Sequence, residues 1–71
     1  MKIRFKDEKA MEEFSKRDPS FHRHNHNMVK NFGMKTFKVE IDDTGDFWDT
    51  IDGDFTIQIE DESHYFTIVE E

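Results

Sequence analysis

The sequence predicts a small α+β fold in two layers, with an antiparallel sheet of four to five strands packed on one N-terminal helix. Two observations lead to this fold class. Apolar and polar residues alternate at the start of the chain and repeatedly after residue 36, which is typical of half-buried strands. Between these regions, a capping residue and helical spacing indicate a helix. The predicted order is β–α–(short α)–β–β–β–β within a single domain, residues 1–71.

The first strand and the first helix follow from local pattern. From Lys2 to Lys6, apolar residues alternate with cationic ones, so one face of the strand is interior and the other basic. Asp7 is a suitable N-cap for the helix that follows, because its carboxylate can accept amides of the first turn. Phe14 belongs to the inward stripe of that helix. Asp18-Pro19 closes it, since proline disfavours helical geometry in the residue before it.

The segment from Ser20 to Gly33 gives a weaker pattern. Three Asn and three His in this run are indifferent helix formers. We therefore expect a loop that leads into a short helix near Asn27 to Phe32, with Gly33 as its C-terminal stop.

Strand patterns and turn residues fill the remainder of the chain. Strand alternation begins at Thr36, and Gly45 supplies the positive φ for a turn over residues 42–46. Asp52-Gly53 indicates a two-residue hairpin, which would place Thr50 opposite Phe55 and Trp48 opposite Ile57 on the buried face.

Two further strands complete the predicted sheet. Asp54 to Glu60 gives the clearest strand pattern, followed by a turn. The strand from Tyr65 to Val69 is apolar or neutral on both faces. Such a strand is either central in its sheet or part of an interface.

Charge is distributed unevenly along the chain. Residues 39–71 carry twelve carboxylates and no Lys or Arg, whereas residues 1–38 carry ten basic and five acidic residues. The two parts therefore have charges of −12 and 10 − 5 = +5, which sum to −7. This balance argues against direct binding of nucleic acid or anionic lipid through the acidic part.

Composition also excludes several kinds of site and location for this protein. Without cysteine, neither disulfides nor thiolate metal sites can form. The charged N-terminus lacks the apolar run of a signal peptide, and no apolar stretch approaches the length of a membrane span. We expect a cytoplasmic protein with no membrane association.

No motif for catalysis or for a cofactor is present. None of the three serines lies in a nucleophile elbow, and the chain has neither a phosphate-cradling glycine loop nor a dinucleotide fingerprint. The acidic turns fail the calcium-loop pattern, because isoleucine occupies the position of the bidentate glutamate in both registers. We expect a non-enzymatic protein without a cofactor.

The acidic part is the main functional feature. Ordinary surfaces intersperse both signs of charge, and concentrating one sign destabilises a fold through self-repulsion. We therefore expect this surface to bind a basic surface on a partner protein and to inhibit or modulate it. The predicted contact residues are Asp42, Asp43, Asp46, Trp48, Asp49, Asp52, Asp54, Glu60, Asp61 and Glu62, with Trp48 as an anchor if it is exposed.

The chemistry of basic surfaces suggests the kind of partner. Basic protein surfaces mostly bind nucleic acid, so a polymerase or a nuclease inhibited by DNA mimicry is the sharpest version of this hypothesis. By analogy, a small size and the lack of enzyme motifs would suit an inhibitor that a phage or a mobile element encodes for the takeover of its host.

Two alternatives remain open. The opposite charges of the two parts and the two-faced last strand would also suit a homodimer with a structural or accessory role. The second alternative is a metal-binding module, because His22, His24 and His26 would share one face of an extended segment.

Overall fold

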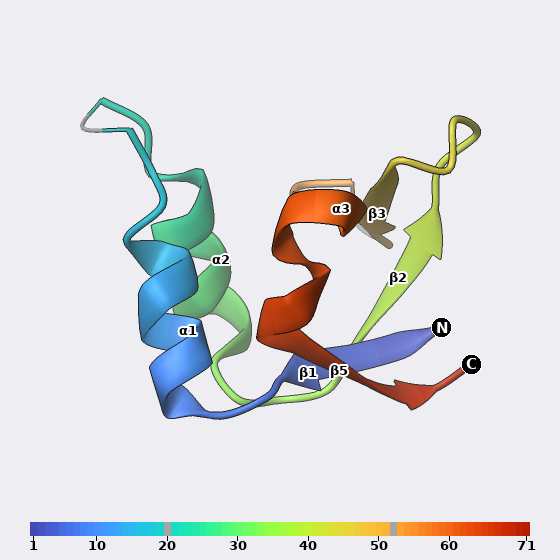
Figure 1. The fold of residues 1–71 in the computed structure, drawn as a ribbon, viewed down its shortest axis with the longest axis horizontal. Coiled ribbons are helices and arrows are strands. Elements are labelled where there is room, and N and C mark those ends of the chain that lie inside the picture. The colour runs from blue at the N-terminus through green and yellow to red at the C-terminus, as the bar shows by residue number, and fades with distance from the viewer. Residues whose placement is uncertain (20, 52) are drawn as a thin grey trace.

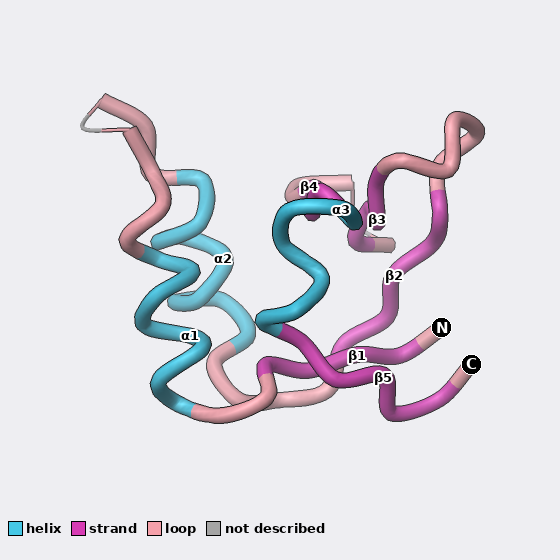
Figure 2. The backbone as a smooth tube through the Cα atoms, in the orientation of Figure 1, coloured by secondary structure: helices cyan, strands magenta, loops and turns pink. Residues whose placement is uncertain are grey.

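The fold is a five-stranded antiparallel sheet with helices packed on one face (Figures 1 and 2). It is seen in a computed structural model that describes residues 1–19, 21–51 and 53–71. The strands are β1 (Lys2–Phe5), β2 (Phe37–Ile41), β3 (Phe47–Thr50), β4 (Thr56–Gln58) and β5 (Phe66–Glu70). The helices are α1 (Glu8–Ser15), α2 (His24–Phe32) and α3 (Ile59–Glu62), and a 3₁₀ turn, η1, spans Ser63–Tyr65. The predicted α+β class is confirmed.

The basic first strand lies inside the sheet, between β2 and β5. The strand order is β4-β3-β2-β1-β5, so β1 pairs with β2 on one side and with β5 on the other. Ile3 lies opposite both Phe37 and Ile68, and the Lys2 ammonium lies 3.6 Å from the Glu70 carboxylate. Two regions of opposite charge in the sequence therefore meet within one sheet.

Aromatic rings join the sheet to the helices. Phe5 of β1 and Phe14 of α1 are fully buried, with ring centroids 5.3 Å apart in an edge-on arrangement. Phe66 of β5 contacts both rings, at 4.5 Å from Phe5 and 5.3 Å from Phe14. Met28, on the inward face of α2, is also fully buried and contributes to this core. Aromatic burial on this scale provides a large part of the apolar stabilisation of so short a chain.

The first helix begins as the sequence predicts. The Asp7 carboxylate accepts the Ala10 amide at 2.7 Å, the usual N-cap hydrogen bond. The helix ends at Ser15, three residues before Asp18. Figure 1 shows α1 and α2 side by side at one end of the sheet, with the two chain termini near each other at the opposite end.

The second helix is longer than predicted. It begins at His24 instead of near Asn27, so the expected loop there is wrong. The reason is tertiary: the Asp18 carboxylate accepts the amides of Asn25 and His26, which a local reading of the sequence does not reveal. The predicted stop is confirmed, since α2 ends at Gly33 with a φ of +54°.

The hairpin of β3 and β4 has the predicted register. Trp48 lies opposite Ile57, and the Thr50 amide donates to the Phe55 carbonyl at 3.0 Å. The Asp52-Gly53 turn itself lies partly outside the described residues. Trp48 is 6% exposed, as expected for the buried face, so it cannot serve as an exposed anchor for a partner.

One predicted strand is shorter than expected, and the structure decides the position of another. The run from Asp54 to Glu60 is not one strand: β4 covers Thr56–Gln58, and the chain then turns into α3. The Gln58 amide, which points away from β3, is accepted by the Glu62 side chain at 2.9 Å, so the start of α3 is held against the end of β4. The last strand lies at the edge of the sheet, so of the two predicted positions the central one is excluded and the interface stays a prediction.

Candidate functional site

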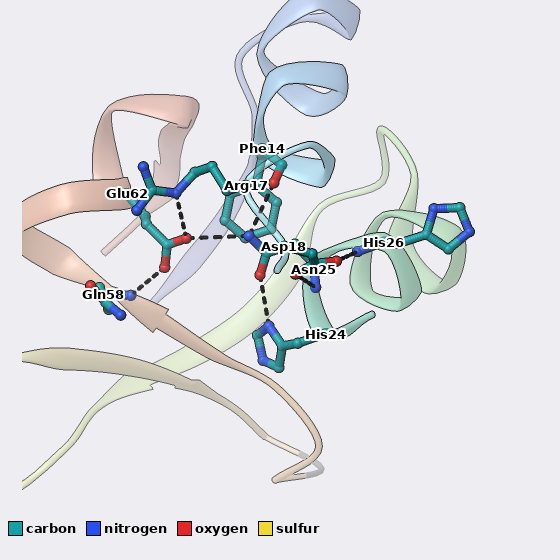
Figure 3. Close-up of polar contacts among 8 residues, drawn as sticks. All are labelled: Phe14, Arg17, Asp18, His24, Asn25, His26, Gln58 and Glu62. Carbon is teal, nitrogen blue, oxygen red and sulfur yellow. Dashed lines mark hydrogen bonds and ion pairs between the residues drawn. The ribbon is translucent and has the colours of Figure 1, made fainter. Parts of the chain in front are cut away.

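A buried carboxylate lies where α3 meets the two long helices (Figure 3). Glu62 is 6% exposed. One carboxylate oxygen accepts the Gln58 amide at 2.9 Å, and the other accepts Arg17 Nε at 3.2 Å and Asn25 Nδ2 at 3.4 Å. A carboxylate removed from water requires such partners, because an unpaired buried charge is strongly destabilising. The predicted role of Glu62 as a partner contact is therefore wrong: its charge is satisfied inside the fold.

Asp18 and Asn25 hold the ends of α1 and α2 together. The two Asp18 oxygens accept the backbone amides of Asn25 and His26, each at 2.8 Å, so Asp18 caps α2 from outside the helix. The Asn25 side-chain amide also donates to the Phe14 carbonyl of α1 at 3.0 Å. A local capping rule would not find this pair, because cap and amides are seven and eight residues apart.

His24 extends this network to the sheet edge. Its Nε2 accepts the Thr56 amide at 3.1 Å, so Nδ1 carries the proton and donates to Asn25 Oδ1 at 2.7 Å. His22 and His26 are exposed, in the loop before α2 and on α2 itself. The predicted shared face in an extended segment is therefore wrong. Among residues 1–19, 21–51 and 53–71, no group of three metal-ligating side chains is found.

Charge within the network is compensated. Burial lowers the pKa of Arg17, but the hydrogen bond to Tyr65 and the Glu62 carboxylate outweigh burial and raise that pKa above its usual value. A cavity of about 330 Å³ lies over this network, lined in part by Arg17, Asp18, His22 and Glu62. Over the described part of the chain, every buried side-chain N or O atom has a hydrogen-bond partner. The network therefore holds the fold together.

The turn between β2 and β3 is organised by one carboxylate. Asp42 Oδ1 accepts the Thr44 hydroxyl at 2.9 Å, the Gly45 amide at 3.0 Å and the Phe47 amide at 3.3 Å. Desolvation raises the pKa of Asp42, but these hydrogen bonds outweigh it and lower that pKa below its usual value. Gly45 has a φ of +79°, which confirms the predicted turn residue. Asp42 is thus half-buried and engaged in its own turn.

An acidic groove joins this turn to α3. The Ile59 amide donates to the Asp46 carbonyl at 3.0 Å, which brings together two acidic segments that lie far apart in the sequence. The groove has a volume of about 390 Å³. Its lining, which defines the acidic groove, consists of Gly45, Asp46, Phe47, Gln58, Ile59, Glu60 and Asp61. Three exposed carboxylates thus surround a partly apolar floor of Phe47 and Ile59.

The other predicted contact residues lie around this groove and on the hairpin. Asp43 is exposed in the same turn as Asp46. Asp49 is half-buried on β3, where it lies opposite Glu40 and accepts the Thr56 hydroxyl at 3.2 Å. Asp54 is exposed in the connection between β3 and β4, and Asp52 lies outside the described residues.

Ion pairing distinguishes the groove from the network. In the part of the chain that the structure describes, ion pairs join Lys2 to Glu70, Lys16 to Glu12 and Arg17 to Glu62. None of them involves a groove carboxylate. Like charges without counter-charges repel one another, so the groove presents a negative field to solvent.

Comparisons with protein-family models, with curated proteins and with solved structures give no match to this chain. Among the described residues, no helix combines the length and apolar character that a membrane crossing requires.

Proposed function

We propose that this protein is a non-enzymatic binding protein whose acidic groove engages a basic surface on a partner protein and inhibits or modulates it. The observation that carries the proposal is the gathering of Asp46, Glu60 and Asp61 around one groove without an ion pair to any described basic residue. Their mutual repulsion opposes folding, and a cationic partner would relieve it. Asp42, Asp43, Asp49 and Asp54 extend the negative field beyond the groove.

The groove suits a lysine or arginine side chain in size and chemistry. Such side chains place their aliphatic stem on apolar surface while the charged head remains near polar groups. Phe47 and Ile59 provide the apolar surface, and the carboxylates of Asp46, Glu60 and Asp61 provide acceptors for the head. Basic surfaces of this kind are common on enzymes that bind nucleic acid, so we propose a polymerase or a nuclease as the class of partner.

The test is a capture experiment with three forms of the tagged protein: wild type, groove variant and matched control. The groove variant is Asp46→Asn/Glu60→Gln/Asp61→Asn. The control, Glu8→Gln/Glu12→Gln/Glu13→Gln, removes the same charge from α1. We expect wild type and control to retain one discrete basic protein from bacterial lysate at about 0.1 M salt and to release it near 1 M, where screening is much stronger.

The groove variant is expected to lose that protein while remaining folded. Purified partner is then titrated with each form, and its activity on nucleic acid is assayed. Equal binding by wild type and groove variant would refute a role for the groove. If the groove variant and the α1 control lose the captured protein equally, net charge alone explains the binding and the groove has no specific role.

A further inference from the structure

The two edges of the sheet differ in how their backbone groups are satisfied. At the β4 edge, the amides of Thr56 and Gln58 point away from β3, since the Ile59 amide and the Phe55 carbonyl face that strand. Side chains occupy both outward amides: His24 Nε2 accepts from Thr56 and Glu62 Oε1 accepts from Gln58. This edge is three residues long and closed by side chains, which is a known protection against edge pairing.

In the described part of the chain, no side chain covers the β5 edge in this way. The Lys6 amide donates to the Tyr65 carbonyl at 3.0 Å, and Arg4 lies opposite Thr67 in the same ladder. Because hydrogen-bonded pairs alternate in an antiparallel ladder, the backbone groups of Phe66 and Ile68 point away from β1. The Phe66 amide bonds the Ser63 carbonyl in the preceding 3₁₀ turn. The Phe66 carbonyl and both backbone groups of Ile68 therefore face the side of β5 that has no neighbouring strand.

Apolar side chains accompany these backbone groups. Ile68 is 47% exposed and Val69 is 50% exposed, although both lie within a strand. Edge strands are usually blunted by charged residues, and on β5 charge begins only at Glu70. The pairing of β5 with β1 is irregular at Val69, so the regular open edge is the stretch Phe66–Ile68.

We infer that this open edge binds a second copy of the same chain by antiparallel pairing of β5 with β5. With the two-fold axis at Thr67, the Ile68 amide of each copy donates to the Phe66 carbonyl of the other. Thr67 then faces its own counterpart, a favourable cross-strand pair, and Ile68 lies beside the second copy's Phe66. The two sheets become one continuous sheet, and the β4 strands remain at its ends.

Charge complementarity favours a second copy over an unrelated peptide. With Thr67 opposite its own counterpart, antiparallel pairing places Glu70 of one copy opposite His64 of the other, one residue from Tyr65. On the neighbouring strand, Lys6 lies opposite Tyr65 and Arg4 opposite Thr67. Of these, Lys6 is about two strand spacings, roughly 10 Å, from the incoming Glu70, a distance that two long side chains can span, whereas Arg4 is three residues farther along the strand. An isologous contact of this kind uses the same patch on both copies and closes on itself.

Sedimentation of the untagged protein over about 10 μM to 1 mM tests the inference, since this range detects dimers with dissociation constants in the micromolar to millimolar regime. We expect the weight-average mass to rise toward twice the monomer mass. Ile68→Lys should hold the protein at monomer mass throughout. Ile41→Lys is the matched control, because Ile41 is 59% exposed on the interior strand β2, and it should associate as wild type does.

A second variant separates edge pairing from loss of an apolar contact. Ile68→Pro removes an outward amide without removing a hydrogen bond to β1, so it should fold and remain monomeric. Amide hydrogen exchange supplies a site-specific readout: exchange at Ile68 should slow as wild-type concentration rises, whereas exchange at Ile41 should not depend on concentration.

A wild type that stays monomeric up to about 1 mM overturns the inference, because this edge would then be too weak to pair at accessible concentrations. Association that persists unchanged in Ile68→Lys also overturns it and directs attention to another surface. The inference does not rest on the proposed partner binding, since the groove variant should associate as wild type does.

Discussion

Asp61 and Glu62 are adjacent acidic residues of one short helix, and the structure gives them opposite surroundings. Glu62 is buried, with both oxygens hydrogen-bonded and the Arg17 guanidinium beside it. Asp61 is exposed in the acidic groove and takes part in no ion pair among the described residues. A run of acidic residues in a sequence therefore does not by itself define an acidic surface. Some carboxylates are part of the framework of the fold, and the exposed ones produce the negative field at the surface.

Truncating Glu62 should give the largest effect on stability. Glu62→Ala leaves the Gln58 amide and Arg17 without their acceptor, so we expect the free energy of unfolding to fall by about 2–3 kcal/mol. Asp61→Ala should change it by less than about 0.5 kcal/mol, as is usual for exposed positions. Urea denaturation of both variants measures the difference. Equal losses would remove the distinction between framework and surface carboxylates.

Capping by Asp18 should give the next largest effect. Its carboxylate accepts two amides of α2, whereas Asp7 accepts one amide of α1. Asp18→Ala should therefore cost about 2 kcal/mol and Asp7→Ala about 1 kcal/mol. Denaturation monitored by the helical circular dichroism signal compares them. A larger loss in the Asp7 variant would show that the remote cap contributes little.

Neutralising the groove should alter stability only slightly, and in the opposite direction. The triple variant Asp46→Asn/Glu60→Gln/Asp61→Asn loses mutual repulsion, so we expect stabilisation of less than about 1 kcal/mol at low salt. Wild type should approach the variant as salt is added, because screening weakens the same repulsion. Thermal melts at several salt concentrations test this. A destabilised variant would mean that these carboxylates belong to the framework.

Asp42 should give the smallest effect, visible as a pH dependence. Its pKa is lowered in the folded state, so the unfolded state binds the proton more readily. This contribution is complete above the ordinary carboxyl pKa near 3.8 and is lost as pH falls through the lower folded value. Stability measured between about pH 5 and pH 3 should fall less steeply in Asp42→Asn than in wild type. Identical slopes would contradict the role of the turn hydrogen bonds.

Structural features that depend on residues adjacent in the chain could be predicted from the sequence. Alternation located β1, the capping carboxylate of Asp7 located α1, and turn residues located the hairpin in which Trp48 faces Ile57. The acidic groove could be predicted in part from the sequence, since Asp46, Glu60 and Asp61 are among the predicted contacts. The local pattern missed the start of α2, because Asp18 caps it from seven and eight residues away. It also missed the end of β4, because the Glu62 that bonds Gln58 is held there by Arg17 and Asn25 from distant parts of the chain.

The fold class, the first helix and the excess of negative charge could be predicted from the sequence alone, because periodicity, capping and composition are local properties. Only the tertiary structure decided which carboxylates remain available. Glu62 gained a buried role because α1, α2 and β4 converge on it, and Asp46 met Glu60 because the Ile59 amide bonds the Asp46 carbonyl. The physical reason is that hydrogen-bond satisfaction and burial depend on contacts between segments far apart in the chain.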